Sequence, residues 1–102
     1  MENAELIQYW RTSAQHDVEA MDNLFKGGNY AWALFIGHLI LEKTLKARWI
    51  LDNESNVPPK THSLDKLARE TKLVWEEPKL SWLVQANDFN LEARYPDYKM
   101  EF

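Results

Sequence analysis

The chain has 102 residues, which suits one domain over residues 1–102 and leaves no room for two independent cores. Its formal charge of −4 argues against a protein that binds nucleic acid through overall positive charge, and its 45% of apolar residues argues against disorder. The absence of cysteine excludes disulfides, thiolate metal sites and cysteine nucleophiles.

The first segment has the pattern of a long amphipathic helix. Apolar residues recur at intervals of three and four from Leu6 to Phe25, which predicts a helix over about 4–26. Gly27 and Gly28 then supply a left-handed stop, and the Asn29 side chain is expected to cap the next helix. The two helices should therefore form a tight hairpin.

The second predicted helix, over 30–51, is apolar on most of its circumference and contains no proline, so it should be central in the fold. Its longest uncharged stretch, which begins at Gly27 and ends at Leu41, is shorter than the roughly 20 apolar residues that span a bilayer. The acidic N-terminus lacks a signal-peptide pattern. We therefore expect a cytoplasmic protein with no membrane partner.

Turn-forming residues over 52–61, including a Pro-Pro pair, predict a surface loop. A short third helix over 64–71 should follow, capped by Thr61 or Ser63, and Pro78 should open a fourth helix that ends before Pro96. No alternating pattern predicts a strand. The expected class is all-α, an up-and-down antiparallel bundle of four helices.

One polar strip interrupts the second predicted helix. His38, Glu42 and Lys46 are spaced four residues apart and share a face, with Lys43 beside them. The strip is either a solvated edge with a Glu-Lys pair, which such spacing favours, or the lining of a cleft or contact surface. His62, just before the third helix, either points at solvent or stands at the rim of that surface.

Other motifs that carry chemistry are absent from the sequence. Three scattered histidines form no metal-binding spacing, no glycine-rich loop follows a strand, and no serine has a nucleophile-elbow setting, so we expect no metal and no cofactor. The five tryptophans suggest large rings in the core. We expect Trp10, Trp32 and Trp49 to be buried, and either Trp75 or Trp82 to be exposed in an interface.

Four short segments of the chain form a series. Gly-Asn-Tyr-Ala-Trp-Ala opens the second predicted helix, Leu-Glu-Lys-Thr-Leu-Lys-Ala lies inside it, and Thr-His-Ser-Leu-Asp-Lys-Leu follows the proline-bearing loop. Glu-Ala-Arg-Tyr-Pro-Asp-Tyr stands near the end. In this order the segments, which occupy residues 28–33, 41–47, 61–67 and 92–98, resemble the HEPN family, the higher eukaryotes and prokaryotes nucleotide-binding domains.

The resemblance implies an up-and-down bundle of four to five helices that often forms a homodimer. It also implies a partner, a minimal nucleotidyltransferase encoded beside such domains in a toxin–antitoxin-like pair. A nucleotide-binding accessory role is a second implication, because the family resembles the substrate-binding domain of aminoglycoside nucleotidyltransferases. Family members usually carry one more helix after the Arg-Tyr-Pro-Asp segment, whereas this sequence stops at Phe102.

A third implication is metal-independent RNA cleavage. Many members of the family use an arginine followed, after four to six residues, by a histidine. Arg94 stands in that region, but the positions that would need histidine hold Lys99, Met100 and Glu101. We therefore expect no catalytic residues and rank an RNase toxin with a degenerate motif below a binding module. The binding residues expected from the resemblance and the polar strip are Glu42, Lys43, Lys46, His62, Arg94, Tyr95 and Asp97.

Overall fold

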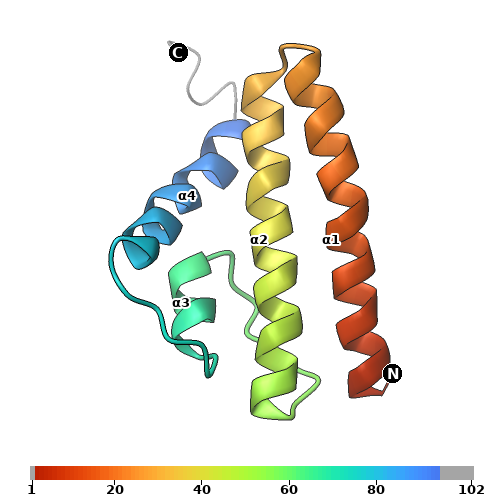
Figure 1. Ribbon diagram of the computed structural model, residues 1–102, viewed down its shortest axis with the longest axis vertical. Helices are drawn as coiled ribbons and strands as arrows, with labels where there is room; N and C mark the ends of the chain where they lie inside the picture. Colours follow the sequence, from red (N-terminus) through yellow and green to blue (C-terminus); the bar gives the residue numbers. More distant parts are fainter. Residues whose placement is uncertain (1, 95–102) are drawn as a thin grey trace.

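A computed structural model describes residues 2–94 of the chain, and the side chains of residues 2–89. It contains four helices and, within residues 2–94, no strand (Figure 1). The all-α fold class and the number of helices are therefore as expected. The helices are α1 (Asn3–Lys26), α2 (Tyr30–Asn53), α3 (Leu64–Arg69) and α4 (Lys79–Arg94).

A long antiparallel hairpin of α1 and α2 forms one half of the molecule (Figure 1). Gly28 makes the turn with φ +81°, a conformation that L residues with a side chain rarely adopt. Asn29 is the N-cap residue of α2, but its side chain makes no capping hydrogen bond, so that prediction was wrong. Its ψ of 65° lies outside the extended region from which a capping side chain reaches the next free N–H groups.

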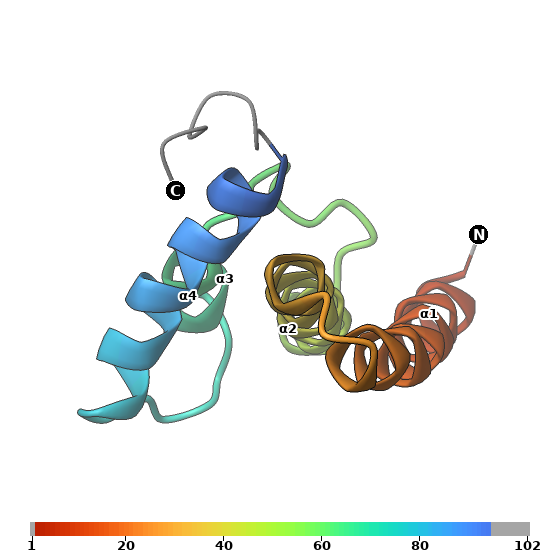
Figure 2. The ribbon, with the colours of Figure 1, turned by 90° about the horizontal axis from the view of Figure 1, so that it is seen from above.

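The second helix is central, as its apolar circumference predicts. It contacts α1 on one side and both α3 and α4 on the other, and among the described residues α1 contacts no other helix. Seen from above in Figure 2, α1 and α4 lie on opposite sides of α2. The main core lies between α2, α3 and α4. It consists of Leu45, Leu64, Leu67, Ala68, Leu83 and Ala86, and Trp75 and Phe89 pack against it.

Small residues let α1 and α2 approach closely. Ala14, Ala33 and Ala47 are buried, and a Cβ atom added at Gly37 would lie 3.3 Å from the sulfur of Met21. The small residues therefore allow the backbones of α1 and α2 to pack closely together.

The second helix continues two residues beyond the predicted end, to Asn53. The Asp52 carboxylate accepts a hydrogen bond from Arg48 Nε at 2.9 Å and from the Lys72 backbone N–H at 2.7 Å. The Asn53 side chain donates to the carbonyl oxygens of Trp49 and Glu70. These contacts with the segment after α3 satisfy polar groups at the end of α2. No local sequence pattern predicts them.

The short third helix is capped by Ser63, one of the two predicted residues. Ser63 Oγ accepts from the Lys66 N–H, while the hydroxyl of Thr61, the other candidate, accepts from the Ser63 N–H. Helix α4 begins directly after Pro78, whose carbonyl oxygen accepts from the Trp82 N–H at 3.1 Å. Proline therefore precedes the helix at a position where its missing N–H has no cost.

The tryptophans divide differently from the prediction. Trp49 is buried and Trp10 is partly buried, but 49% of Trp32 is exposed, so its assignment to the core was wrong. Trp32 lies in the first turn of α2, far from the short α3, and among the described side chains its one ring contact is with Phe35. Of Trp75 and Trp82, one was expected to be exposed. Trp82 is 58% exposed, whereas Trp75 packs on the core.

Candidate functional site

The carboxylate of Glu42 is the centre of a buried polar cluster on α2. Its side chain is only 7% exposed. Oε1 accepts a hydrogen bond from His62 Nδ1 at 2.8 Å, and Oε2 accepts one from Lys46 Nζ at 3.1 Å. His38, fully buried one turn earlier, places Nδ1 3.9 Å from Oε1. Three of the seven predicted binding residues, Glu42, Lys46 and His62, are thus brought into one cluster.

His62 is tied to α2 twice. His38 Nε2 lies 3.1 Å from the carbonyl oxygen of His62, and because a carbonyl only accepts, His38 carries its proton on Nε2. The His62 ring donates from Nδ1 to Glu42, while half of its side chain, 52%, remains exposed. The loop that ends at Thr61 is therefore fixed against α2 by one backbone contact and one side-chain contact.

Burial alone would raise the pKa of Glu42, because a charged carboxylate loses hydration there. Hydrogen bonds from His62 and Lys46, together with their positive charges, outweigh this effect and hold the pKa below its usual value of 4.5. Glu42 is therefore an anion at neutral pH. Since a buried charge is tolerated only when it is paired and hydrogen-bonded, the cluster depends on Lys46 and on the hydrogen bond from His62.

The first helix closes one side of this cluster. Lys46 Nζ lies 5.5 Å from the centre of the Trp10 ring, in a cation–π arrangement. The Trp10 indole nitrogen is buried and has no hydrogen-bond partner among the described residues. The polar strip is therefore covered from α1 as well as from the loop.

The solvated-edge interpretation of the strip was wrong, because His38 and Glu42 are 1% and 6% exposed. Lys43, the neighbour of Glu42, turns to the other helix of the hairpin, where its Nζ donates to Ser13 Oγ and Asp17 Oδ2, each at 2.7 Å. One residue corresponds to a rotation of about 100° around a helix, which separates Lys43 from the cluster.

The remaining predicted residues are at the end of the chain. Arg94 is the last residue of α4, and its side chain is outside the described part. Tyr95 and Asp97 lie outside the described residues altogether. An Arg94–Glu42 pair therefore stays a prediction.

Sequence reasoning missed a second polar cluster, which joins α3 to α4. Asn87 accepts from the Leu64 backbone N–H and donates to Asp65 Oδ1, both at 2.9 Å. The hydrogen bond from Asn87 is the largest cause that lowers the pKa of Asp65, and Ser63 adds to it. An asparagine 23 residues after its partner leaves no local signal in a single sequence, so only the folded chain could reveal this contact.

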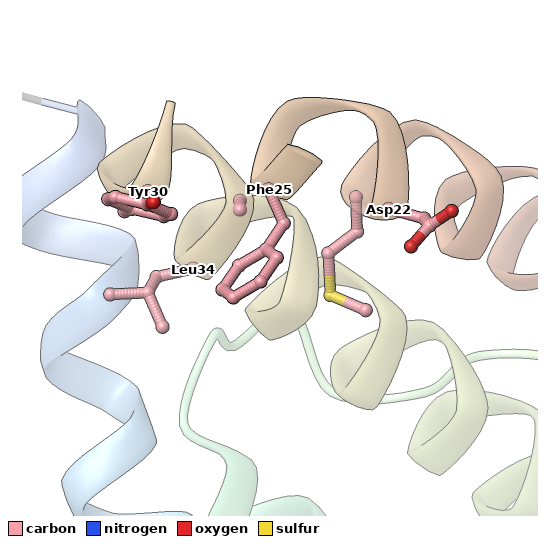
Figure 3. A pocket seen from close by; sticks show the side chains of 6 residues that line it. Asp22, Phe25, Tyr30 and Leu34 are labelled. Atoms are coloured by element: carbon pink, nitrogen blue, oxygen red, sulfur yellow. The ribbon is translucent and has the colours of Figure 1, made fainter. Parts of the chain in front are cut away.

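The surface carries two largely apolar hollows that bear on function. One, shown in Figure 3, lies at the hairpin tip and has Asp22, Phe25, Tyr30 and Leu34 among its lining residues. The other lies between α2 and α4, with Trp82 exposed at its side. Apolar surface of this kind is typical of contact with another protein.

Neither a metal-binding group nor a membrane-spanning helix is found among the described residues. No group of three histidine or acidic side chains among them could hold a metal ion. No helix among them is long and apolar enough to cross a bilayer. The two lysines among the expected binding residues, Lys43 and Lys46, each bind a carboxylate of the chain itself.

The comparison with protein-family models identifies the family of the chain. The family model described as HEPN domain matches residues 7–101, nearly the whole chain. No curated protein and no solved structure matches the sequence. Because the match covers well over half of the chain and the fold is the helical bundle that the resemblance implies, the chain belongs to the HEPN family.

Proposed function

We propose that this HEPN domain is a binding module that dimerises and pairs with a minimal nucleotidyltransferase in a toxin–antitoxin-like two-protein system. The observation that carries the proposal is the apolar hollow between α2 and α4. Its lining is Leu41, Trp75, Lys79, Trp82, Leu83 and Ala86. The kind of partner follows from the resemblance to HEPN domains encoded beside such enzymes.

The surface around this hollow favours a protein partner over a small ligand. Trp82 exposes more than half of its surface there, and tryptophan is the residue most enriched among the strong contacts of protein interfaces. Among the described residues of the lining, Lys79 is the one that carries a charge, and it forms no ion pair with the described part of the chain. A partner surface with an apolar centre and an acidic rim would therefore be complementary to it.

The pairing is tested by affinity capture of the tagged full chain from its native cells. We expect a nucleotidyltransferase in stoichiometric amount, and its loss with Trp82→Ala. Trp32→Ala is the matched control, because Trp32 is similarly exposed, at 49%, but lies on α2 away from this hollow. Capture of no nucleotidyltransferase by the wild-type chain would overturn the pairing.

The nucleotide-binding alternative has less support from the described side chains. Lys43 and Lys46 are each engaged by a carboxylate, so a phosphate would have to compete with Asp17 or Glu42. Stabilisation of the full chain by ATP well beyond that by inorganic phosphate would support this role instead.

One observation favours the RNase alternative, the contact between His62 and Glu42. A buried carboxylate that holds one ring nitrogen of a half-exposed histidine is an arrangement used for general acid–base catalysis. RNA cleavage by the wild-type chain that His62→Ala abolishes, without a loss of folding, would favour this function. Intact RNA in the presence of excess protein would exclude it.

A further inference from the structure

One face of the α1–α2 hairpin is left uncovered by the rest of the described chain. Two rows of residues spaced by seven lie along it, Arg11, Val18 and Phe25 on α1 and Leu34, Leu41 and Arg48 on α2. A spacing of seven is nearly two helical turns, so each row keeps to one side of its helix. The four apolar members are each 40% exposed or more.

The two rows belong to one face because the hollows on it are shared by both helices. The hollow at the hairpin tip is lined by Phe25 of α1 and Leu34 of α2 (Figure 3). A further hollow, near the opposite end of the hairpin from its tip, has Arg11 and Arg48 among its lining residues. We call this surface, with Asp22 at its tip end, the hairpin face.

Charge on the hairpin face is divided between its two ends. Arg11 and Arg48 line the hollow at one end, and Asp22 lines the hollow at the tip. Arg11 forms no hydrogen bond or ion pair with the described residues. Arg48 binds Asp52 through Nε, and Asp22 binds Lys26 in an exposed pair. The side chains of Asp22 and Lys26 are 55% and 72% exposed and that of Arg48 is 39% exposed, so these charges remain accessible to another chain. Two arginines therefore line one end of the face, and one aspartate lines the tip.

The register of the hairpin puts the midpoint of this charge pattern at Leu41. Lys43 binds both Ser13 and Asp17 and is therefore level with the residue between them. Leu41, two residues earlier in α2, is then level with about Asp17 of α1. That level is halfway between Arg11 and Asp22, which are about 16 Å apart along α1 at 1.5 Å per residue.

We propose that the hairpin face binds the same face of a second copy of this chain, with the two hairpins antiparallel. A two-fold axis that crosses the helices at the level of Leu41 would bring Arg11 of each copy to the level of the other copy's Asp22. The exposed apolar rows would meet between these charges, and two hairpins would complete a four-helix bundle. A parallel arrangement would instead place like ends together, which repels.

This inference rests on the proposed function for the statement that the domain dimerises, and it adds the surface and its orientation. The face is distinct from the α2–α4 hollow except at Leu41, which borders both. Arg11 and Asp22 stand clear of that hollow, so their substitution tests self-association without touching the surface proposed for the nucleotidyltransferase.

The test is a charge exchange measured by size-exclusion light scattering of the purified full chain over a dilution series. The wild type should have twice the chain mass of 12.1 kDa. Arg11→Asp and Asp22→Arg should each weaken association about tenfold or more, because each leaves two like-charged contacts per dimer. The double variant should restore association, since the exchanged charges again face each other across the two-fold axis.

Matched controls reverse charges away from the hairpin face. Lys60→Asp and Glu76→Arg alter exposed charges in the loop after α2 and in the segment before α4, and should leave association unchanged. Thermal unfolding of every variant checks that the fold is retained. A wild-type monomer at all concentrations, or a dimer that none of these substitutions changes, would overturn the proposal.

The two proposals can fail separately. A chain that captures the nucleotidyltransferase but stays monomeric would refute the antiparallel dimer alone. A dimer that responds to the charge exchange but captures no nucleotidyltransferase would refute the pairing alone.

Discussion

The central helix has two sides of opposite character. On the side toward α3 and α4, the helix contributes to an apolar core in which Leu64, Leu67 and Ala68 have no exposed surface. The carboxylate of Glu42, on the same helix, is hydrogen-bonded. On the hairpin face, large apolar side chains of the same helix remain exposed. The comparison shows that apolar composition alone does not tell which side of a central helix its own chain will cover. Stability should therefore reside on the first side, and association on the second.

The largest effect on stability should come from the core side. Leu67→Ala should lower the free energy of unfolding by about 3 kcal/mol, because it removes a fully buried side chain and leaves a cavity among three helices. Urea unfolding followed by circular dichroism measures the change. A loss below about 1 kcal/mol would mean that this core is loosely packed.

Glu42→Ala should lower the free energy of unfolding by a somewhat smaller amount, about 2 kcal/mol. The substitution leaves Lys46 facing a carboxylate-free cavity and releases the His62 ring from α2. Glu19→Ala on the exposed part of α1 is the control and should change stability by less than about 0.5 kcal/mol. Equal effects of the two substitutions would contradict a structural role for the buried cluster.

The contribution of Glu42 should depend on pH in a defined direction. Its pKa is lower in the folded chain than the ordinary 4.5, so the charged form is favoured by folding. The stabilisation is therefore complete above about pH 4.5 and is lost as the pH falls through the lower folded value. Unfolding free energies of the wild type and Glu42→Ala should accordingly converge on acidification. A constant difference between them would contradict this linkage.

A substitution at the interface between α1 and α2 should have a smaller effect on the free energy of unfolding. Lys43→Met removes two hydrogen bonds to α1 but keeps the length and apolar stem of the side chain, and we expect a loss of about 1 kcal/mol. The loss stays small because Asp17 keeps 20% of its side chain exposed and can be hydrated when its partner is removed. Urea unfolding at low and high salt separates the charge contribution, which salt screens.

The smallest effect on the fold is expected on the hairpin face. Leu34→Gln should change the unfolding free energy of the monomer by less than about 0.5 kcal/mol, since nearly half of this side chain is already in water. Self-association, measured by light scattering, should nevertheless weaken. A strong loss of monomer stability would show that Leu34 belongs to the core and would remove the contrast between the two sides.

The elements of the fold were largely determined by local sequence. Residue spacing, the Gly27–Gly28 stop and the prolines fixed four helices to within a few residues, because helix boundaries depend on backbone chemistry that is close in sequence. The extension of α2 to Asn53 was not predicted because Asn53 donates a hydrogen bond to the Glu70 carbonyl oxygen and Asp52 accepts one from the Lys72 N–H, and both partners are distant in sequence. Likewise, the neighbours of Trp32 in the sequence are apolar and do not indicate that about half of its surface is exposed.

For the candidate site, the sequence determined which polar residues share one face of α2, and the tertiary structure decided what that face meets. Helical periodicity places His38, Glu42 and Lys46 together wherever the helix lies. Their burial, and the arrival of His62 from a loop 20 residues after Glu42, depend on long-range packing of the chain. The same holds for the hairpin face. The spacing of seven residues in its two rows can be recognised in the sequence, but the exposure of these residues depends on where α4 packs. Periodicity is a property of one helix, whereas burial is a property of its neighbours.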